Sequence, residues 1–455
     1  MRAIIAVTMC LSVATSASAS ASGPQIALRV VPAVSVVDAP LSIRVVHAAP
    51  GARIRIRAGT TMFGRKFESS ATFVANSRGE VNPRKSAPIT GSYQGIDGMG
   101  LFWSMVPKKT GAVASGSGKP FDYLAPRNVT LRASDGRQEA ARTITRIAVG
   151  QDIRYVDLRR PGLYGRFYRH TGPRRLPVIV VVGGAEGGVP EDRPAILASH
   201  GFNAFALAYF GADGLPSGLA NIPIEDVRNA ITWLQHQPTV DSTRIGIVGG
   251  SKGAELALLA ASRFSQIRSV VAFSPSSVVY PGLFYGKGSG LAPSSWSYRG
   301  RPLPYVDGKV PKGVEARIDS DIRAGRPVSY APEYLAELEN ATNLRSADIA
   351  VERINGPVML ISGDDDRLWP STFMARAIMR RLGSFPRRPK DIWLRYARAG
   401  HEIGEPYYTY SDSTLAHLPR YVMALGGSPR ANATASADAW PRVVSFLESS
   451  LGAMP

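Results

Sequence analysis

The sequence predicts an α/β fold, in which a mostly parallel sheet carries helices on both faces, preceded by a smaller all-β domain. From about Tyr155 onward, short apolar runs alternate with segments whose apolar residues recur at helical spacing. Residues 24–150 instead contain short stretches of alternating polar and apolar residues, separated by turn signals. A Gly-x-Ser-x-Gly pentapeptide stands between a predicted strand and a predicted helix of the second part.

The composition is that of a globular protein with an unusual charge. The 455 residues are enough for two domains, and a hydrophobic content of 44% with 20% charged residues is ordinary. The formal net charge of +19 would suit a phosphorylated substrate, an anionic envelope surface or nucleic acid. No dense basic run occurs, so we favour a basic solvated surface, and we regard nucleic acid as the weakest of these candidates.

The first 21 residues have the order expected of a signal peptide. Arg2 precedes a short apolar run, and Ala17-Ser18-Ala19 and Ala19-Ser20-Ala21 both fit signal peptidase cleavage. We therefore expect export to the periplasm or the exterior. The only cysteine, Cys10, would leave with this segment, which excludes disulfides, a thiolate nucleophile and cysteine metal sites from the mature chain. No later stretch approaches the length of a membrane span.

Residues 24–150 are predicted to form a small immunoglobulin-like sandwich. Leu41–Val45 and Arg53–Arg57 alternate with period two, the second with arginines on one face and isoleucines on the other. The segment 91–105 departs from this pattern, because glycines there alternate with large apolar residues. We expect an irregular loop, with Phe102 and Trp103 packed on the second domain; the alternative is that the loop forms part of a binding wall.

The second domain, expected over residues 155–455, begins with a buried strand at Pro177–Val182. The glycine-rich loop 183–188 follows it and lacks the Lys-Ser/Thr ending of a phosphate-binding loop. We therefore assign this loop to an oxyanion hole, with the amide of Ala185 as the donor and that of Glu186 as the alternative. Further strands and helices are expected in the following order: a helix ending near His200, a strand at 204–209, a helix at about 223–237 and a strand at 270–273.

The pentapeptide Gly249–Gly253 fits the nucleophile elbow of α/β-hydrolases. It follows the apolar run Arg244–Val248 and precedes a helix expected from Glu255 on. Glycines two places before and after Ser251 let other backbone approach a strained turn. The amide of Lys252 would then point at a developing oxyanion. The alternative is an ordinary glycine-rich turn before a helix.

A serine nucleophile needs a histidine base and a carboxylate, which follow it in this fold in the order acid, then histidine. His401 follows the predicted strand 391–396. The aspartates Asp364, Asp365 and Asp366 follow the strand 358–362, and spacing alone does not separate them. The remaining histidines are expected to be structural or on the surface: His47, His170, His200, His236 and His417. An insertion at about 281–345 is expected to act as a lid, or else to be a plain surface excursion. No metal or cofactor site is predicted.

Several separated motifs resemble the acyl-CoA thioesterase / bile acid-CoA:amino acid N-acyltransferase family. They are Gly250-Ser251-Lys252-Gly253-Ala254-Glu255, Asp365-Asp366 with Trp369, Gly400-His401-Glu402-Ile403 with Pro406-Tyr407, and the segment around Trp103. Ala254 and Glu405 replace a glycine and a proline of the family pattern. The resemblance implies a β-sandwich, an α/β-hydrolase domain, and cleavage of acyl-CoA thioesters by a Ser (or Cys)/Asp/His triad in which Asp366 is the acid.

The leading hypothesis is a serine acyl hydrolase that acts on acyl thioesters or related esters. An acyltransferase that passes the acyl group to an amino acid is the second hypothesis. A catalytically idle envelope-binding protein is the third, although binding alone would not require an Asp–His pair behind a serine. Serine forms an oxyester intermediate, whereas cysteine would form a thioester. A thioester prefers amines over water more strongly than an oxyester does, so Ser251 favours hydrolysis.

Overall fold

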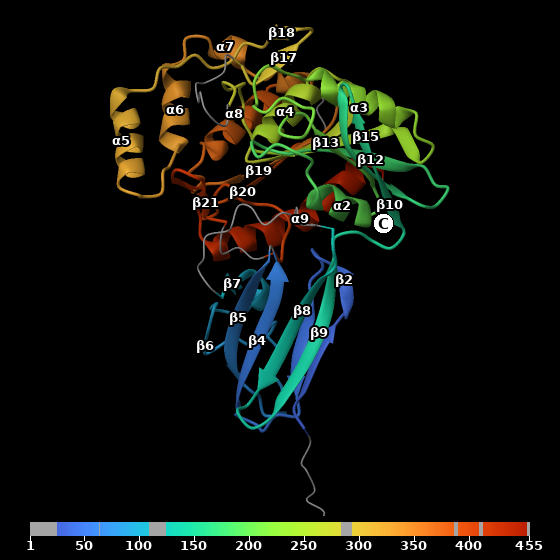
Figure 1. The fold of residues 1–455 in the computed structure, drawn as a ribbon, viewed down its shortest axis with the longest axis vertical. Coiled ribbons are helices and arrows are strands. Elements are labelled where there is room, and N and C mark those ends of the chain that lie inside the picture. Colours follow the sequence, from blue (N-terminus) through green and yellow to red (C-terminus); the bar gives the residue numbers. More distant parts are fainter. Residues whose placement is uncertain are drawn as a thin grey trace, which may run out of the picture.

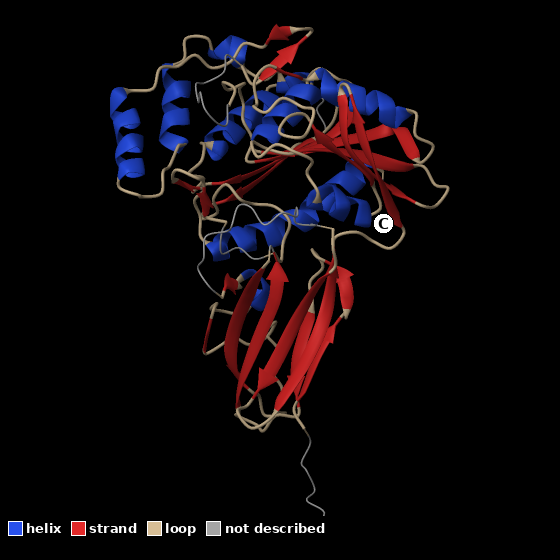
Figure 2. Cartoon of the chain, viewed as in Figure 1, coloured by secondary structure: helices blue, strands red, loops and turns tan. Residues whose placement is uncertain are grey.

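The computed structural model describes residues 25–62, 64–108, 124–283, 294–385, 390–408 and 413–452. The predicted signal peptide lies outside these residues. An all-β part and an α/β part follow each other along the chain and lie one below the other in Figure 1. Figure 2 shows helices on both faces of the upper sheet, whereas the lower part is built almost entirely of strands.

Two sheets form the all-β part and share one apolar core. The smaller sheet pairs β1 (Ala27–Val31) with β3 (Ser42–Val46). The larger has the order β2-β9-β8-β4-β5-β6, with β7 also paired to β5. Its strands are β2 (Val34–Val36), β4 (Arg53–Met62), β5 (Arg65–Val74), β6 (Thr90–Gly91), β7 (Val106–Pro107), β8 (Arg127–Ser134) and β9 (Glu139–Ile147). In β4 the arginines are exposed and the isoleucines buried, as the alternation predicts. The finer assignment to an immunoglobulin-like class stays a prediction.

The aromatic segment differs from the irregular loop that we expected. It contains the short helix α1 (Gly100–Trp103), whose four residues are all buried. Trp103 lies against Tyr93 and donates to Asp97 at 2.7 Å, so it belongs to the core of the all-β part. Phe102 reaches the second domain, because it lines a small interface cavity together with Tyr407 and Tyr408. Ala433 of α9 (Pro429–Leu451) belongs to the same core cluster as Phe102 and Trp103, so this segment packs on the second domain as expected.

The α/β part is built on an eight-stranded sheet of order β10-β11-β13-β12-β15-β16-β19-β20. The first three strands are antiparallel neighbours, and every pair from β13 onward is parallel. The strands are β10 (Ile153–Arg160), β11 (Leu163–His170), β12 (Leu176–Val182), β13 (Asn203–Ala208), β15 (Val240–Gly250), β16 (Ile267–Phe273), β19 (Val358–Gly363) and β20 (Ile392–Tyr396). This order, with the third and fourth strands exchanged, is that of the α/β-hydrolase fold.

Helices bury both faces of this sheet. Alternate residues of β12 point to opposite cores: Val180 joins the core under α3 (Glu225–Gln235), α4 (Lys252–Ala261) and α8 (Ser371–Gly383). Val181 joins the core under α2 (Asp192–Ser199) and α9 (Pro429–Leu451). Because both faces are covered, the strands consist of nearly continuous apolar runs.

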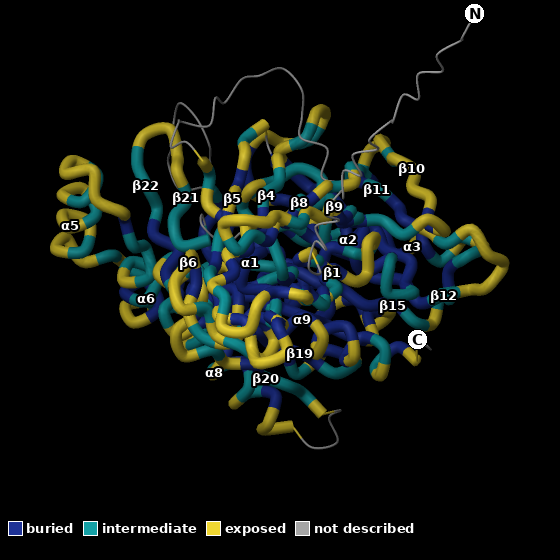
Figure 3. Tube along the Cα trace, turned by 90° about the horizontal axis from the view of Figure 1, so that it is seen from below, coloured by how far each residue is buried: buried dark blue, intermediate teal, exposed yellow. Residues whose placement is uncertain are grey.

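The insertion leaves the sheet after β16 and returns at β19. It contains β17 (Trp296–Tyr298), β18 (Arg301–Pro302), α5 (Lys312–Arg323), α6 (Ala331–Asn340), α7 (Leu344–Ala347) and the 3₁₀ helix η1 (Val351–Arg353). β17 extends a small sheet with β14 (Ile222–Pro223), and a separate hairpin joins β21 (Leu415–His417) to β22 (Val422–Ala424). Helix α5 has no buried residue and lies at the periphery in Figure 3.

Asp38 joins the two parts through a buried carboxylate. Its Oδ2 accepts hydrogen bonds from Trp440 Nε1 on α9 at 2.7 Å and, when that ring nitrogen is protonated, from His200 Nε2 at 2.5 Å. Nearby, the buried Arg146 donates to the carbonyl oxygens of Val37 and Ala39 at 2.5 and 2.8 Å. These contacts hold the segment after β2 against helices α2 and α9, which cover one face of the eight-stranded sheet.

We expect Asp38→Ala to lower the free energy of unfolding by about 3 kcal/mol, because it leaves a buried indole N–H and an imidazole without their acceptor. Asp152→Ala is the matched control, since Asp152 pairs with His170 at 2.8 Å but its side chain is 65% exposed. The control should cost less than about 1 kcal/mol. Urea denaturation of both variants measures the difference, and equal losses would contradict the assigned role of Asp38.

Candidate active site

Ser251 occupies a strained turn between β15 and α4. Its φ of 56° and ψ of −123° are unfavourable for a residue with a side chain. A methyl group on Gly249 would lie 2.2 Å from the carbonyl oxygen of Gly253, and one on Gly253 would lie 2.2 Å from that of Gly183. Both glycines are therefore required by close backbone approach. The helix begins at Lys252, three residues earlier than the sequence pattern predicts.

His401 and Asp366 face each other in a buried pair. The Nδ1 atom of His401 lies 2.9 Å from Oδ2 and 3.1 Å from Oδ1 of Asp366. The carboxylate also accepts hydrogen bonds from the Ser371 hydroxyl at 2.6 Å and from the amides of Leu368 and Trp369 at 3.0 and 3.2 Å. These donors fix the orientation of the carboxylate, so it can hold the imidazole in one tautomer.

The neighbouring aspartates point elsewhere. Asp364 pairs with Arg395 at 2.7 Å, and Asp365 pairs with Arg367 at 3.0 Å and accepts from the amide of Gly427 at 2.9 Å. The tertiary structure thus separates three carboxylates that spacing alone left equivalent. The other five histidines lie outside the lining of the cavity described next.

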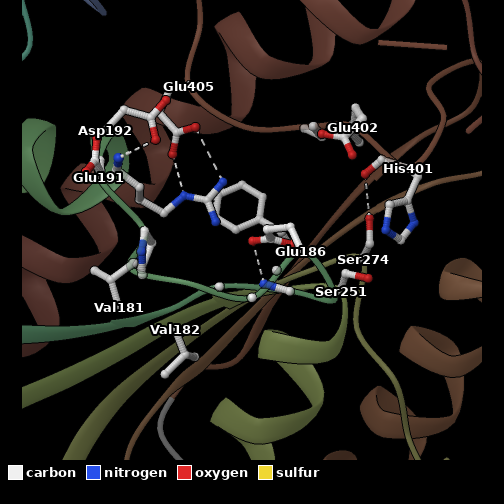
Figure 4. A pocket seen from close by; sticks show the side chains of 18 of the residues that line it. Val181, Val182, Glu186, Glu191, Asp192, Ser251, Ser274, His401, Glu402 and Glu405 are labelled. Carbon is white, nitrogen blue, oxygen red and sulfur yellow. Dashed lines mark hydrogen bonds and ion pairs between the residues drawn. The ribbon is translucent and has the colours of Figure 1, made fainter. Parts of the chain in front are cut away.

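Ser251 and His401 line the same cavity, of about 620 Å³, at the carboxyl edge of the sheet (Figure 4). No hydrogen bond joins the Ser251 hydroxyl to His401 in the described part of the chain. Such contacts often tighten only when substrate binds. None of the described insertion residues lines the cavity, so the predicted lid finds no support among them.

Helix α9 and the loop after β16 hold the His401 segment in place. The side chain of Asn432 on α9 accepts from the amide of Gly400 at 2.8 Å, and the Ser274 hydroxyl donates to the carbonyl oxygen of His401 at 2.8 Å. The indole of Trp369 packs edge-on against the imidazole with the ring centroids 6.1 Å apart. The base is therefore positioned by contacts on three sides.

Burial and the neighbouring charges shift the pKa of His401 in opposite directions. Burial lowers the pKa of the imidazole, but the charge of Asp366 and its hydrogen bond outweigh burial, with further contributions from Glu402 and Glu186. The net effect raises the pKa of His401 above its ordinary value. The imidazolium that forms when the ring accepts a proton is therefore stabilised.

The two predicted oxyanion donors occupy different positions. Lys252 begins α4 directly after Ser251, and its side chain turns away from the cavity to pair with Glu255 at 2.9 Å. The glycine-rich loop lines the cavity through Gly183, Gly184, Glu186 and Gly187, whereas Ala185 is not among the described lining residues. Gly184 donates its amide hydrogen to the Glu186 carboxylate at 2.8 Å. The role of Ala185 stays a prediction.

Sequence reasoning missed the acidic surroundings of the site. Glu402 and Glu405 stand so close to His401 in the chain that their position could have been inferred. The contribution of α2 could not, because its residues Asp192 and Arg193 reach the cavity only through tertiary packing. The described residues contain no cluster of three His, Cys, Asp or Glu side chains suited to a metal ion, and none of their helices is long and apolar enough to cross a membrane.

Comparison with known proteins gives matches along most of the chain. Residues 222–453 match the family described as BAAT / Acyl-CoA thioester hydrolase C terminal, and residues 38–160 match the Acyl-CoA thioester hydrolase/BAAT N-terminal region. The chain is 28% identical over 432 residues to acyl-coenzyme A thioesterase 2, mitochondrial, of Mus musculus, with 91% of this chain and 87% of the relative covered. It is also 28% identical over 422 residues to acyl-coenzyme A thioesterase 1 of Homo sapiens, with 91% and 94% covered.

Among solved structures, a putative dienelactone hydrolase from Klebsiella pneumoniae aligns at 17% identity and a TM-score of 0.37, covering 65% of this chain and 97% of that chain. The strand order of the central sheet, rather than this low score, defines the fold. With its C-terminal family match extending over more than half of the sequence, the chain belongs to the acyl-CoA thioester hydrolase/BAAT family of α/β-hydrolases.

Proposed function

We propose that this protein is a serine hydrolase that cleaves acyl thioesters through an acyl-enzyme intermediate. The main support is that Ser251, on its strained turn, and His401 line the same cavity. The Nδ1 atom of His401 is bound to Asp366, which leaves Nε2 for the serine. The curated relatives are named acyl-coenzyme A thioesterases, which supports a thioester as the substrate class.

In the acylation step, His401 Nε2 takes the proton of the Ser251 hydroxyl while the serine oxygen attacks the carbonyl carbon. The negative charge that develops on the carbonyl oxygen is stabilised by the amide of Lys252 and an amide of the 183–188 loop. The carbon–sulfur bond then breaks, and the imidazolium gives its proton to the departing thiolate. Asp366 stabilises the imidazolium and keeps the ring in the correct tautomer.

In the second step, water takes the place of the thiol. His401 accepts a proton from that water, whose oxygen attacks the ester carbonyl, and the free acid leaves as Ser251 regains its proton. The intermediate is an oxyester, and its preference for an amine over water as the acyl acceptor is weaker than that of a thioester. Hydrolysis is therefore the expected outcome, and N-acyl transfer to an amino acid is the alternative.

We expect Asp366→Asn to lower kcat by about three to four orders of magnitude, because the amide cannot stabilise the imidazolium and favours the wrong tautomer. Steady-state kinetics with an acyl thioester measures the effect. Asp364→Asn and Asp365→Asn are matched controls within the same loop, because their carboxylates pair with Arg395 and Arg367. They should change kcat by less than about tenfold, and a loss at Asp365 as large as that at Asp366 would contradict the assignment.

Ser251→Ala is expected to abolish acyl release, because no oxygen remains to form the acyl-enzyme. With the native chain, mass spectrometry of the products should find the free acid even when glycine or taurine is abundant. A dominant N-acyl amino acid would instead establish the acyltransferase alternative. Full activity of Ser251→Ala would show that the elbow is not the reactive centre.

We also propose that the protein is exported after cleavage of residues 1–21. The support is the order of Arg2, the apolar run and the small residues, all of which lie outside the described part of the chain. Intact-mass measurement of protein recovered from the cell envelope should find a mature N-terminus near Ser20 or Ser22. Recovery of the chain with Met1 or Arg2 still attached would contradict export by this route.

A further inference from the structure

The start of the glycine-rich loop lies directly against the nucleophile. A methyl group on Gly184 would lie 3.3 Å from Ser251 Cβ and 3.2 Å from the carbonyl oxygen of Gly250. A methyl group on Gly253, in the first turn of α4, would lie 2.2 Å from the carbonyl oxygen of Gly183. The backbone of Gly184 is therefore within contact distance of the residue that would form the acyl-enzyme.

A hydrogen bond from Tyr209 fixes the direction of the Gly184 amide. The hydroxyl of this buried tyrosine donates to the carbonyl oxygen of Gly183 at 2.6 Å. In a trans peptide, the carbonyl of one residue and the N–H of the next point in opposite directions. The N–H of Gly184 consequently points away from Tyr209, and Gly184 is one of the residues that line the active-site cavity.

The Glu186 carboxylate occupies the space in front of this amide. Its Oε1 accepts the Gly184 N–H at 2.8 Å. Its Oε2 lies 2.8 Å from the place that a methyl group on Gly184 would take, so the carboxylate covers this glycine closely. Glu186 is nevertheless exposed, and Figure 4 shows it beside the turn that carries Ser251. The side chain can therefore rotate into solvent and uncover the amide.

A positive charge also favours an anionic oxygen at this position. Arg193 binds Glu405 through Nε and Nη2, and its Nη1 makes no hydrogen bond to the described residues. A methyl group on Gly250 would lie 3.4 Å from this Nη1. Burial lowers the pKa of Arg193, but nearby carboxylates, Glu186 among them, raise it overall. The guanidinium and the Glu186 carboxylate therefore attract each other next to Ser251.

We propose that the amide of Gly184 is the second donor of the oxyanion hole and that Glu186 occupies this hole in the free protein. The inference rests on the proposed function, because an oxyanion forms only if Ser251 attacks a carbonyl carbon. A carboxylate oxygen that accepts from the Gly184 N–H shows where a substrate oxyanion would be bound. The two negative charges repel each other at one donor, so Glu186 rotates away when substrate binds. The amides of Gly184 and Lys252 then stabilise the oxyanion together.

A pair of ketones tests whether Glu186 blocks the hole. Heptyl trifluoromethyl ketone has an activated carbonyl: Ser251 adds to its carbon, His401 accepts the serine proton, and the ketone oxygen becomes an oxyanion. Heptyl methyl ketone has the same chain without this activation. We expect Glu186→Ala to lower the inhibition constant of the trifluoromethyl ketone by about fivefold or more, because no carboxylate competes for the amide. The constant of the methyl ketone should change by less than about twofold.

Glu402→Gln separates this effect from a general loss of negative charge. Glu402 acts on the pKa of His401, as Glu186 does, after burial and Asp366. The Gly184 amide, however, is bound to Glu186. Glu402→Gln should therefore leave the inhibition constant of the trifluoromethyl ketone within about twofold. Equal tightening in the two variants, or no tightening in Glu186→Ala, would overturn the proposal.

Two substitutions at Gly184 test the donor itself. Gly184→Pro removes the N–H, whereas Gly184→Ala keeps it, and both add a carbon at the same crowded position. We expect Gly184→Pro to lower kcat for an acyl thioester by about a hundredfold and Gly184→Ala by less than about tenfold. Equal losses would overturn the assignment of the donor. If thermal unfolding shows that Gly184→Pro is not folded, the ketone measurements decide alone.

Failure of the hydrolase function gives a different result. If the native chain binds the trifluoromethyl ketone no more tightly than Ser251→Ala does, Ser251 does not add to carbonyl groups, and the inference falls with the proposed function. If the native chain binds it more tightly than Ser251→Ala and Glu186→Ala brings no further gain, the hydrolase function stands and the role of Glu186 is wrong.

Discussion

The backbone conformation of Ser251 is the constraint on which the active site depends. A residue with φ of 56° is held there because β15 and α4 are both fixed in the core, so the strain of the turn is small against the packing on either side. Gly249 and Gly253 allow the neighbouring backbone to come within contact distance. The turn projects the hydroxyl at the carboxyl edge of the sheet, where the loops after β19 and β20 deliver Asp366 and His401.

Helix α9 connects the all-β part to this site. One of its residues, Trp440, donates to Asp38 of the N-terminal part, and another, Asn432, holds the amide next to His401. The contacts that attach the two parts and those that position the base therefore lie on one rigid element. This arrangement gives the N-terminal part a physical connection to catalysis, although its own strands supply no residue to the cavity lining among the described residues.

Charge is distributed unevenly in this protein. The chain has a formal net charge of +19, whereas the described lining of the cavity contains five carboxyl side chains and one guanidinium. Arg193, in the cavity wall, pairs with Glu405, and Lys252 pairs with Glu255 behind the nucleophile. The net charge of the chain therefore does not describe the surroundings of Ser251.

The sequence by itself determined the features that depend on residues close together in the chain. Period-two alternation identified the strands of the all-β part, and the Gly-x-Ser-x-Gly turn with its flanking strand and helix identified the fold and the candidate nucleophile. The positions of the acid loop and of His401 were predicted because each follows a predicted strand and the acid precedes the histidine in the chain. Only the tertiary structure decided which aspartate faces His401, that Gly100–Trp103 form a short buried helix, and that α2 brings Asp192 and Arg193 to the cavity. Those outcomes depend on contacts between residues far apart in the chain, which no local pattern encodes.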